Sequence, residues 1–228
     1  MSRRTYNQFC GLARSLDVVG ERWTLLIVRE LMSGPKRYVD LSSALDGIGT
    51  SLLATRLRHM EEDGVVHKRQ LPRPAASLVY ELTEAGQELA RAMLPLALWG
   101  VRHQVGPISP DNEYRAEWSL VFIAQLVDRS KIGTEDVVYE FRIAGSSAFM
   151  RFRHGEVSVF EDNASGHVDA TVSTEPDVIV DLSAGRSTLV DAVAGGRIVV
   201  EGDPVAAAML LEALPERITP DAGLPAPA

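Results

Sequence analysis

A short run of structure-breaking residues near the middle of the sequence most constrains the fold. Residues 106–112 read Gly-Pro-Ile-Ser-Pro-Asp-Asn, which offers little that a core could bury. Glycine and proline interrupt helices and strands, and a chain of 228 residues is long enough for two domains. We therefore expect a first domain over 1–105, a linker over 106–112, a second domain over 113–214, and a flexible tail over 215–228, where four prolines recur.

The charge of the chain changes sign at the same place. Residues 1–105 carry 14 Lys and Arg against 11 Asp and Glu, a net charge of +3. Residues 106–228 carry 9 against 20, a net charge of −11, which makes −8 for the whole chain. A polyanion would be attracted by the first part and repelled by the second. Double-stranded DNA is therefore a candidate partner of the first domain alone.

The composition excludes a collagen-like, mucin-like or wholly disordered chain. With 46% apolar and 24% charged residues, the chain is composed like an ordinary globular protein. The sequence shows no signal peptide and no apolar run approaching the ~18 to 20 residues that span a bilayer, so we expect a cytoplasmic protein with no membrane partner. One cysteine and five scattered histidines predict neither an internal disulfide nor a metal site.

Apolar periodicity in the first domain predicts a winged helix-turn-helix. Helical spacing of apolar residues covers 9–19, 23–31, 38–45 and 50–63, and glycines follow these stretches. Residues 65–69 and 78–82 are typical of paired strands with a basic loop between them, and Thr83 then caps a long helix. Helices followed by such a hairpin form the motif whose recognition helix enters the DNA major groove.

The helix at 50–63 carries the predicted DNA-reading surface. Leu53, Leu57 and Met60 share one face, which we expect to be buried, and the opposite face presents small polar residues and one arginine. Such a face suits a helix that reaches base edges and phosphates, although a merely solvated face is the alternative. The basic hairpin beside it favours DNA binding. We predict DNA contacts from nine residues: Arg37, Thr50, Ser51, Thr55, Arg56, Arg58, Lys68, Arg69 and Arg73.

Individual roles within this set differ. Arg58 and Thr55 point outward and are predicted to read bases, whereas Arg73 lies at the hairpin tip and is predicted to contribute general affinity. Arg56 lies at the edge of the buried face, so an anchoring ion pair is the alternative for this residue.

A series of motifs runs through the first domain in linked order. They are the segment from Cys10 to Leu31, the segment from Gly34 to Leu41, Leu53-x-x-Arg56-Leu57, the segment from Glu61 to Gly64, the segment from Val79 to Gly86, and Trp99-Gly100. This series resembles the HxlR-type winged-helix transcriptional regulators of bacteria over roughly the first 105 residues. One departure is Gly49, where the family commonly has Ser or Thr. Glycine still serves as an N-cap, but it offers no side chain for a phosphate contact.

Cys10 has two interpretations. Some members of the family sense oxidants or electrophiles through a cysteine at this N-terminal position, so the resemblance implies a redox-sensitive thiol. The alternative is a small apolar packing residue. We favour the packing role, because no second cysteine is present to resolve a sulfenate within the chain.

The long helix at 87–105 has apolar residues on two sides. Leu89, Met93 and Leu96 form one stripe, and the nearly opposite stripe consists of Leu94, Leu98, Val101 and Val105. A helix that is apolar on both sides must be covered on both sides. We expect the second stripe to pack on the same helix of another copy, which predicts a two-fold homodimer. Cover by the acidic domain of the same chain is the alternative.

The second domain is predicted to be α+β, with a mainly antiparallel sheet and its helices on one face. Alternating or short apolar stretches at 137–143, 148–153, 156–161, 170–173 and 198–200 indicate strands. Helices are expected at about 113–128, after Thr174-Glu175-Pro176-Asp177, and from Asp203-Pro204 to Leu214.

Three segments of this domain carry a second resemblance. The segments from Asp169 to Thr174, from Leu182 to Arg186 and from Gly196 to Pro204 are similar to those of sterol-carrier-protein-like domains, over about 113–214. Members of that group hold fatty-acyl or sterol-like molecules between sheet and helices, so the resemblance implies a lipid-like effector. We expect the pocket to be lined by Phe141, Phe149, Phe160 and Met209, with an ordinary core as the alternative.

Together these features predict a dimeric bacterial DNA-binding regulator controlled by an apolar small molecule, with no other cofactor. No phosphate-binding loop, nucleophile elbow or His-Glu-x-x-His helix occurs in the sequence, so we expect no catalytic residues and no enzyme. The alternative function is a lipid-binding or lipid-modifying protein whose winged helix serves protein interaction.

Overall fold

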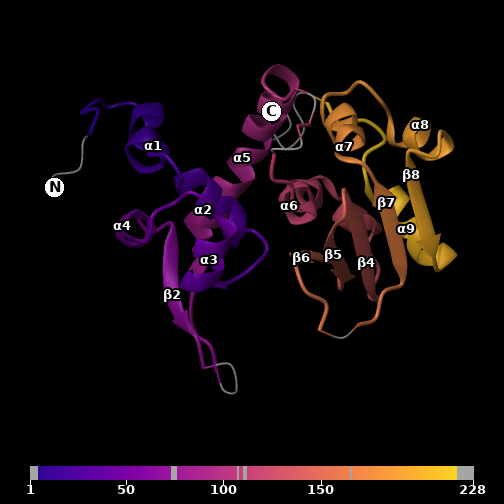
Figure 1. The fold of residues 1–228 in the computed structure, drawn as a ribbon, viewed down its shortest axis with the longest axis horizontal. Helices are drawn as coiled ribbons and strands as arrows, with labels where there is room; N and C mark the ends of the chain where they lie inside the picture. Colours follow the sequence, from indigo (N-terminus) through magenta and orange to yellow (C-terminus); the bar gives the residue numbers. More distant parts are fainter. Residues whose placement is uncertain (1–4, 73–75, 107, 110–111, 165, 220–228) are drawn as a thin grey trace. The chain divides into compact units, whose positions relative to one another are not determined.

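The computed structural model describes residues 5–72, 76–106, 108–109, 112–164 and 166–219 (Figure 1). The chain divides into two compact units, residues 1–90 and 91–228, which are treated separately below. The domain boundary expected at 106–112 stays a prediction, and Pro107, Pro110 and Asp111 within it lie outside the described residues, as does Arg73 of the hairpin loop. Of the expected tail, 215–219 is described and 220–228 is not.

The first unit is a winged helix-turn-helix. Its elements are α1 (Gly11–Val19), α2 (Thr24–Leu31), β1 (Lys36–Arg37), α3 (Tyr38–Ala44), α4 (Thr50–Glu62), β2 (Val66–Gln70), β3 (Leu78–Leu82) and the start of α5 (Glu84–His103). The strands form an antiparallel sheet in the order β1-β3-β2. The sequence predicted these helices and the hairpin, and it missed only the short strand β1, which two residues are too few to signal.

Apolar residues from most of these elements form the core of the first unit. Leu53, Leu57 and Met60 of α4 are buried, as are Ile27, Val28 and Leu31 of α2, Leu41 of α3, and Val79 and Leu82 of β3. α1 differs, since only Ala13 of this helix is buried. Its residues Leu12 and Leu16, together with the preceding Phe9, are exposed in the single chain. Their helical spacing predicted the helix correctly but not its surroundings.

Two glycines set the path from α4 into the wing. Gly64 has a φ of 70°, a left-handed conformation that glycine adopts without strain, and it ends α4 while Val65 N–H bonds to Met60 O at 2.8 Å. Gly86 lies in the first turn of α5, where a Cβ atom would stand 2.1 Å from the carbonyl oxygen of Val65. Only glycine therefore lets α5 approach the strand this closely. The hydroxyl of Thr83 accepts from Gly86 N–H at 3.1 Å, which confirms its expected role as a cap.

The second unit contains the rest of α5 and an α+β fold. The elements after α5 are α6 (Ala116–Leu126), η1 (Arg129–Lys131), β4 (Asp136–Ile143), β5 (Ser146–Arg153), β6 (Glu156–Phe160), β7 (Ala170–Thr174), α7 (Pro176–Ser183), α8 (Leu189–Ala194), β8 (Ile198–Gly202) and α9 (Pro204–Ala213). The sheet has the order β6-β5-β4-β7-β8 (Figure 1). Its strands are antiparallel except for the parallel pair β4 and β7. This confirms the predicted α+β class with a mainly antiparallel sheet.

Helix capping and one half-buried acid fix the geometry of this unit. Pro176 opens α7, and the Asp203 side chain accepts from the backbone N–H groups of Val205 and Ala206 at the start of α9, as predicted. The Asp169 carboxylate accepts from Val138 N–H at 2.7 Å and so ties the start of β7 to β4. The Tyr139 hydroxyl donates to Ala206 O at 3.0 Å and ties the sheet to α9. None of the helices in the described part of the chain is long and apolar enough to cross a membrane.

Candidate nucleic-acid interface and apolar cavity

The exposed face of α4 carries the residues expected to meet DNA. Thr50, Ser51 and Arg58 are exposed, and Thr55 is half-buried with its hydroxyl donating to Ser51 O at 2.9 Å. That bond uses the only proton of the Thr55 hydroxyl, so toward a base this oxygen can act as an acceptor. The buried residues Leu53, Leu57 and Met60 fix the orientation of this face.

A tyrosine that the sequence did not single out holds the two helices of the motif together. The Tyr38 hydroxyl, at the start of α3, donates to the Thr50 carbonyl oxygen at 2.7 Å. Gly49 is the N-cap of α4 and provides no side-chain cap, as expected from its identity. The start of α4 is thus positioned from α3. The position of Tyr38 directly after a strand of only two residues gave no local signal for this role.

Arg56 is an anchor within the first unit. Its guanidinium forms an ion pair with the Glu21 carboxylate at 2.6 Å, and its Nε donates to Arg22 O at 3.3 Å. The Arg56 side chain is only 13% exposed. This geometry supports the alternative of an anchoring ion pair, and a DNA contact by Arg56 stays a prediction. Glu21 and Arg56 are 35 residues apart, so no local pattern indicates their pairing.

The other described cations of the predicted interface each lie beside a carboxylate of their own chain. The pairs are Arg37 with Asp40 at 2.9 Å, Arg58 with Glu62 at 3.9 Å, Lys68 with Glu61 at 2.7 Å, and Arg69 with Glu81 at 2.6 Å. The side chains of these four cations are 37% to 65% exposed. Exposed ion pairs are weak, so a DNA phosphate can compete for each cation.

The electrostatics of two of these pairs follow from their hydrogen bonds. The hydrogen bond from the Arg37 guanidinium lowers the pKa of the Asp40 carboxyl, and the hydrogen bond to Glu61 raises the pKa of Lys68. Lys68 also lies over the Tyr80 ring, 5.6 Å from its centroid. Both cations therefore stay charged at neutral pH, and the hairpin can present its positive charge next to α4.

The residues expected at the dimer interface have unequal exposure. Leu94 and Leu98 are buried in the single chain and Val101 is half-buried, whereas Val105 is 50% exposed. The large exposed apolar side chains of α5 are Leu96 and Trp99. Leu94 and Leu98 thus have little free surface in the single chain, and their place at a dimer interface stays a prediction.

Cys10 is the N-cap of α1 and is exposed. Hydrogen bonds from the backbone at Ala13 and Leu12 lower the pKa of its thiol. Within the single chain the exposure of Cys10 does not fit a buried packing residue, while a lowered pKa favours the reactive thiolate.

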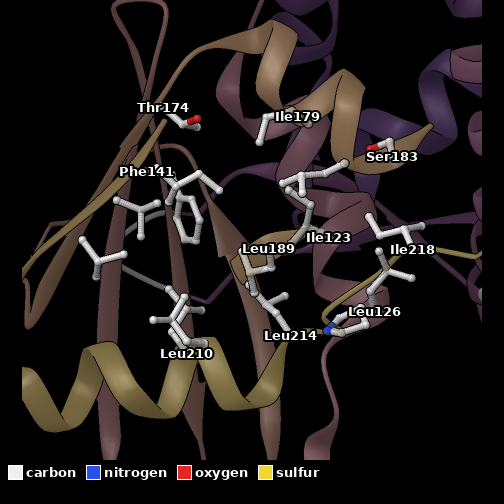
Figure 2. A pocket seen from close by; sticks show the side chains of 16 residues that line it. Ile123, Leu126, Phe141, Thr174, Ile179, Ser183, Leu189, Leu210, Leu214 and Ile218 are labelled. Carbon is white, nitrogen blue, oxygen red and sulfur yellow. The ribbon is translucent and has the colours of Figure 1, made fainter. Parts of the chain in front are cut away.

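An apolar cavity lies in the second unit between the sheet and its helices (Figure 2). Its volume is about 70 Å³. Its sixteen lining residues come from α6, β4, β7, α7, β8 and α9, from Leu189 of α8, and from the chain after α9. None of the sixteen is charged, and the hydroxyls of Thr174 and Ser183 are the polar groups among their side chains. The Thr174 hydroxyl already donates to Arg197 O at 2.9 Å. The cavity therefore suits an apolar molecule.

Only one of the four predicted pocket residues lines this cavity. Phe141 does, but Phe149, Phe160 and Met209 do not. Antiparallel pairing sets Phe141 opposite Ala148 and Glu140 opposite Phe149, and side chains alternate between the faces of a sheet. Phe149 therefore points to the other face, where its ring stacks on that of Phe160 with centroids 5.6 Å apart. In α9 the lining residues are Leu210 and Leu211, which follow Met209.

Both units match known protein families. Residues 18–106 match the HxlR-like helix-turn-helix family, and residues 129–215 match the SCP-2 sterol transfer family. An uncharacterized HTH-type transcriptional regulator of Mycobacterium tuberculosis is 38% identical over 105 residues, which are 46% of this chain and 66% of that protein. The HTH-type transcriptional regulator YodB of Bacillus subtilis is 32% identical over 94 residues, 41% of this chain and 84% of YodB.

The similarity extends to solved structures. The reduced form of the transcriptional regulator YodB from B. subtilis has 30% identity to this chain, covers 42% of it and 96% of its own chain, and superposes with a TM-score of 0.38. The chain spans about 66% of the length of the mycobacterial relative.

Proposed function

Since this chain belongs to the HxlR-like helix-turn-helix family, we propose that it is a cytoplasmic transcriptional regulator that binds double-stranded DNA as a homodimer and responds to an apolar small molecule. The observation that carries the proposal is the exposed face of α4, with Thr50, Ser51 and Arg58 beside the basic hairpin. A rigid helix with a small polar face fits the major groove, and flanking cations neutralise phosphates.

Within this interface the residues have separate tasks. Arg58 and Thr55 read base edges from α4, and Ser51 and Thr50 contact the backbone near the start of the helix. Arg37, Lys68, Arg69 and Arg73 supply affinity that does not depend on sequence. Arg56 keeps α4 in place through Glu21 and does not contact DNA.

The homodimer holds two copies of α4 on two half-sites of one operator. Its contact runs along α5 and just beyond its end, through the exposed side chains of Leu96, Trp99 and Val105 and the half-buried Val101. Leu96 and Trp99 lie one turn apart on the same face of α5. An exposed apolar face of this kind favours packing against the same face of a second copy, related by a two-fold axis.

The cavity of the second unit holds the effector. Its uncharged lining and the match to the SCP-2 sterol transfer family support an aliphatic or sterol-like ligand. Such a ligand alters DNA affinity only if it binds the DNA-competent and incompetent forms with different affinity, and DNA must then change ligand affinity by the same factor. Cys10 offers a second input, because an exposed thiol of lowered pKa is open to oxidation.

A gel shift tests the central proposal. Duplexes selected by the full chain from random sequence should shift more strongly than unselected DNA, and the shift should weaken steeply with salt. The alternative, a lipid-modifying protein whose winged helix binds a protein, requires turnover of a lipid substrate without sequence-selective DNA binding. Selection that returns no enriched sequence would contradict the proposed function as a transcriptional regulator.

A further inference from the structure

The chain after α9 closes one side of the cavity. α9 ends at Ala213, Leu214 takes an extended conformation with φ −91° and ψ 143°, and Pro215 cannot continue a helix. Leu214, Pro215 and Ile218 line the cavity, while Glu216, Arg217 and Thr219 are exposed. Figure 2 shows Leu214 and Ile218 on the side of Leu126, across the cavity from Phe141. We name residues 214–219 the strap.

Few hydrogen bonds hold the strap. Between residues 215–219 and the rest of the described chain there are two: Leu189 N–H donates to Glu216 O at 2.9 Å, and the Arg102 guanidinium donates to Thr219 O at 3.2 Å. The other thirteen lining residues all belong to regular helices or strands. Segments with few hydrogen bonds and exposed backbone open at the lowest cost in free energy.

The two bonds connect the strap to different elements. Leu189 opens α8 and itself lines the cavity. Arg102 lies in the last turn of α5, the helix that begins at Glu84 directly after the wing strand β3. The wall of the cavity that opens most easily is thus bonded to the helix that continues from the DNA-binding unit.

We propose that the strap is the lid of the cavity and that a ligand which displaces it also releases Arg102 at the end of α5. The inference rests on the proposed function, since it names the regulation of the effector site. Protein interiors are close-packed, so an incoming apolar molecule must move a wall, and the strap is the least restrained one. Displacing Ile218 and Leu214 pulls Thr219 away from Arg102, which couples occupancy to the last turn of α5.

The test uses the full chain and the uncharged fluorescent probe N-phenyl-1-naphthylamine. Arg102→Ala removes one of the two hydrogen bonds that hold residues 215–219, so opening costs less and the probe should bind about two- to five-fold more tightly, the effect of one exposed hydrogen bond. Arg91→Ala is the matched control, because Arg91 lies exposed on the same helix and forms no ion pair with a described residue. Its affinity for the probe should equal that of the wild type.

Hydrogen exchange provides a second measurement. Saturating probe should speed the exchange of the Leu189 amide, whose partner Glu216 O moves with the strap, whereas a ligand that leaves the strap closed would slow it. Equal probe affinity of the wild type, Arg102→Ala and Arg91→Ala, together with unchanged exchange at Leu189, would overturn the lid and leave the cavity as a binding site.

DNA affinity separates the lid from the proposed function. The probe should change the affinity of the wild type and of Arg91→Ala for the selected duplex, and this change should shrink in Arg102→Ala. If it is the same in all three proteins, Arg102 is not the link. If the probe opens the strap but no variant binds DNA selectively, the result supports the strap as a lid and contradicts the proposed function as a transcriptional regulator. If the wild type does not bind the probe at all, the lid and the effector site fail together.

Discussion

The candidate site of the first unit lies on its outer surface, whereas the candidate site of the second unit lies in its interior. In the first unit the candidate site is an outer face, where four described cations lie 37% to 65% exposed beside carboxylates of the same chain. In the second unit it is an interior of sixteen uncharged residues. Recognition of a polyanion needs groups that exchange partners at little cost, whereas recognition of an apolar molecule needs space from which water is excluded. Changes to the first site should therefore affect binding alone, and changes to the second should affect binding and stability together.

The largest effect is expected from a charge on the outer face of α5. Trp99→Glu replaces a side chain that is 52% exposed and brings two like charges together across the axis of the proposed dimer. Loss of the dimer removes the gain from binding two half-sites at once, about 100-fold or more in affinity. Sedimentation and gel shift measure both losses. Gln104→Glu adds the same charge at an exposed polar position and should stay dimeric; a dimeric Trp99→Glu protein would place the interface elsewhere.

A smaller effect is expected at Arg58, which is proposed to read bases. Arg58→Ala should cost about 1–3 kcal/mol of binding free energy on the selected duplex and narrow its margin over random DNA. Arg69→Ala, on the wing, should weaken binding to both DNAs alike. Fluorescence anisotropy with both duplexes distinguishes the two patterns. Equal losses on both duplexes for Arg58→Ala would make Arg58 a phosphate contact.

Arg56 is an exception in the first unit, because a change at this residue should lower the stability of the protein. Because Arg56 is 13% exposed and bonded to Glu21 and Arg22 O, Arg56→Gln should lower the free energy of unfolding by about 1–2 kcal/mol. Arg58→Gln, at an exposed site, should change it by less than about 0.5 kcal/mol. Urea denaturation of the two variants measures the difference. Equal stability would return Arg56 to the set of free cations that can meet DNA.

The two faces of the sheet provide a matched pair of variants in the second unit. Phe141→Leu alters the cavity wall and should change the affinity for N-phenyl-1-naphthylamine about three- to ten-fold, since a ring contact of the probe is lost. Phe149→Leu, on the opposite face, should lower stability but leave probe affinity unchanged. Fluorescence titration and thermal unfolding together test the pair. An equal loss of affinity in both would show that the probe binds outside this cavity.

The smallest effect concerns the thiol of Cys10. Its pKa is lowered in the folded chain by backbone hydrogen bonds from Ala13 and Leu12, so the thiolate persists to lower pH than in the unfolded chain. The linked stabilisation is present above the unfolded pKa of about 8.5 and is lost as pH falls through the folded pKa. The rate of alkylation by iodoacetamide should reach its half-maximum at lower pH in the folded chain than in urea. Coincident pH profiles would contradict the hydrogen bonds.

The sequence predicted the exposed and buried faces of single helices better than it predicted contacts between distant segments. The wheel of α4 identified Leu53, Leu57 and Met60 as buried and Ser51 and Arg58 as exposed, because the period of a helix relates spacing to direction. It could not reveal the pairing of Arg56 with Glu21, which depends on tertiary contact over 35 residues.

The residues of the interior sites were harder to predict for a related reason. The choice between Phe141 and Phe149 requires the register of two paired strands, and a shift of one residue exchanges the faces. Likewise, the apolar stripe of α5 indicated that Leu94 and Leu98 must be covered but could not say by what. Composition and order predicted both folds, whereas the residues at each interior site depended on pairings between distant segments.

The parallel pair β4 and β7 has a consequence for how the protein forms during synthesis. Tyr139 pairs with Ala170, 31 residues further along the chain, whereas Gln70 and Leu78 of the wing hairpin are 8 residues apart. Closing the longer loop costs more entropy before any contact compensates for it, so local pairings form faster. The ribosome also releases the first 90 residues well before β7 exists. The newly made chain therefore carries a folded helix-turn-helix unit while the cavity proposed to regulate it is still missing.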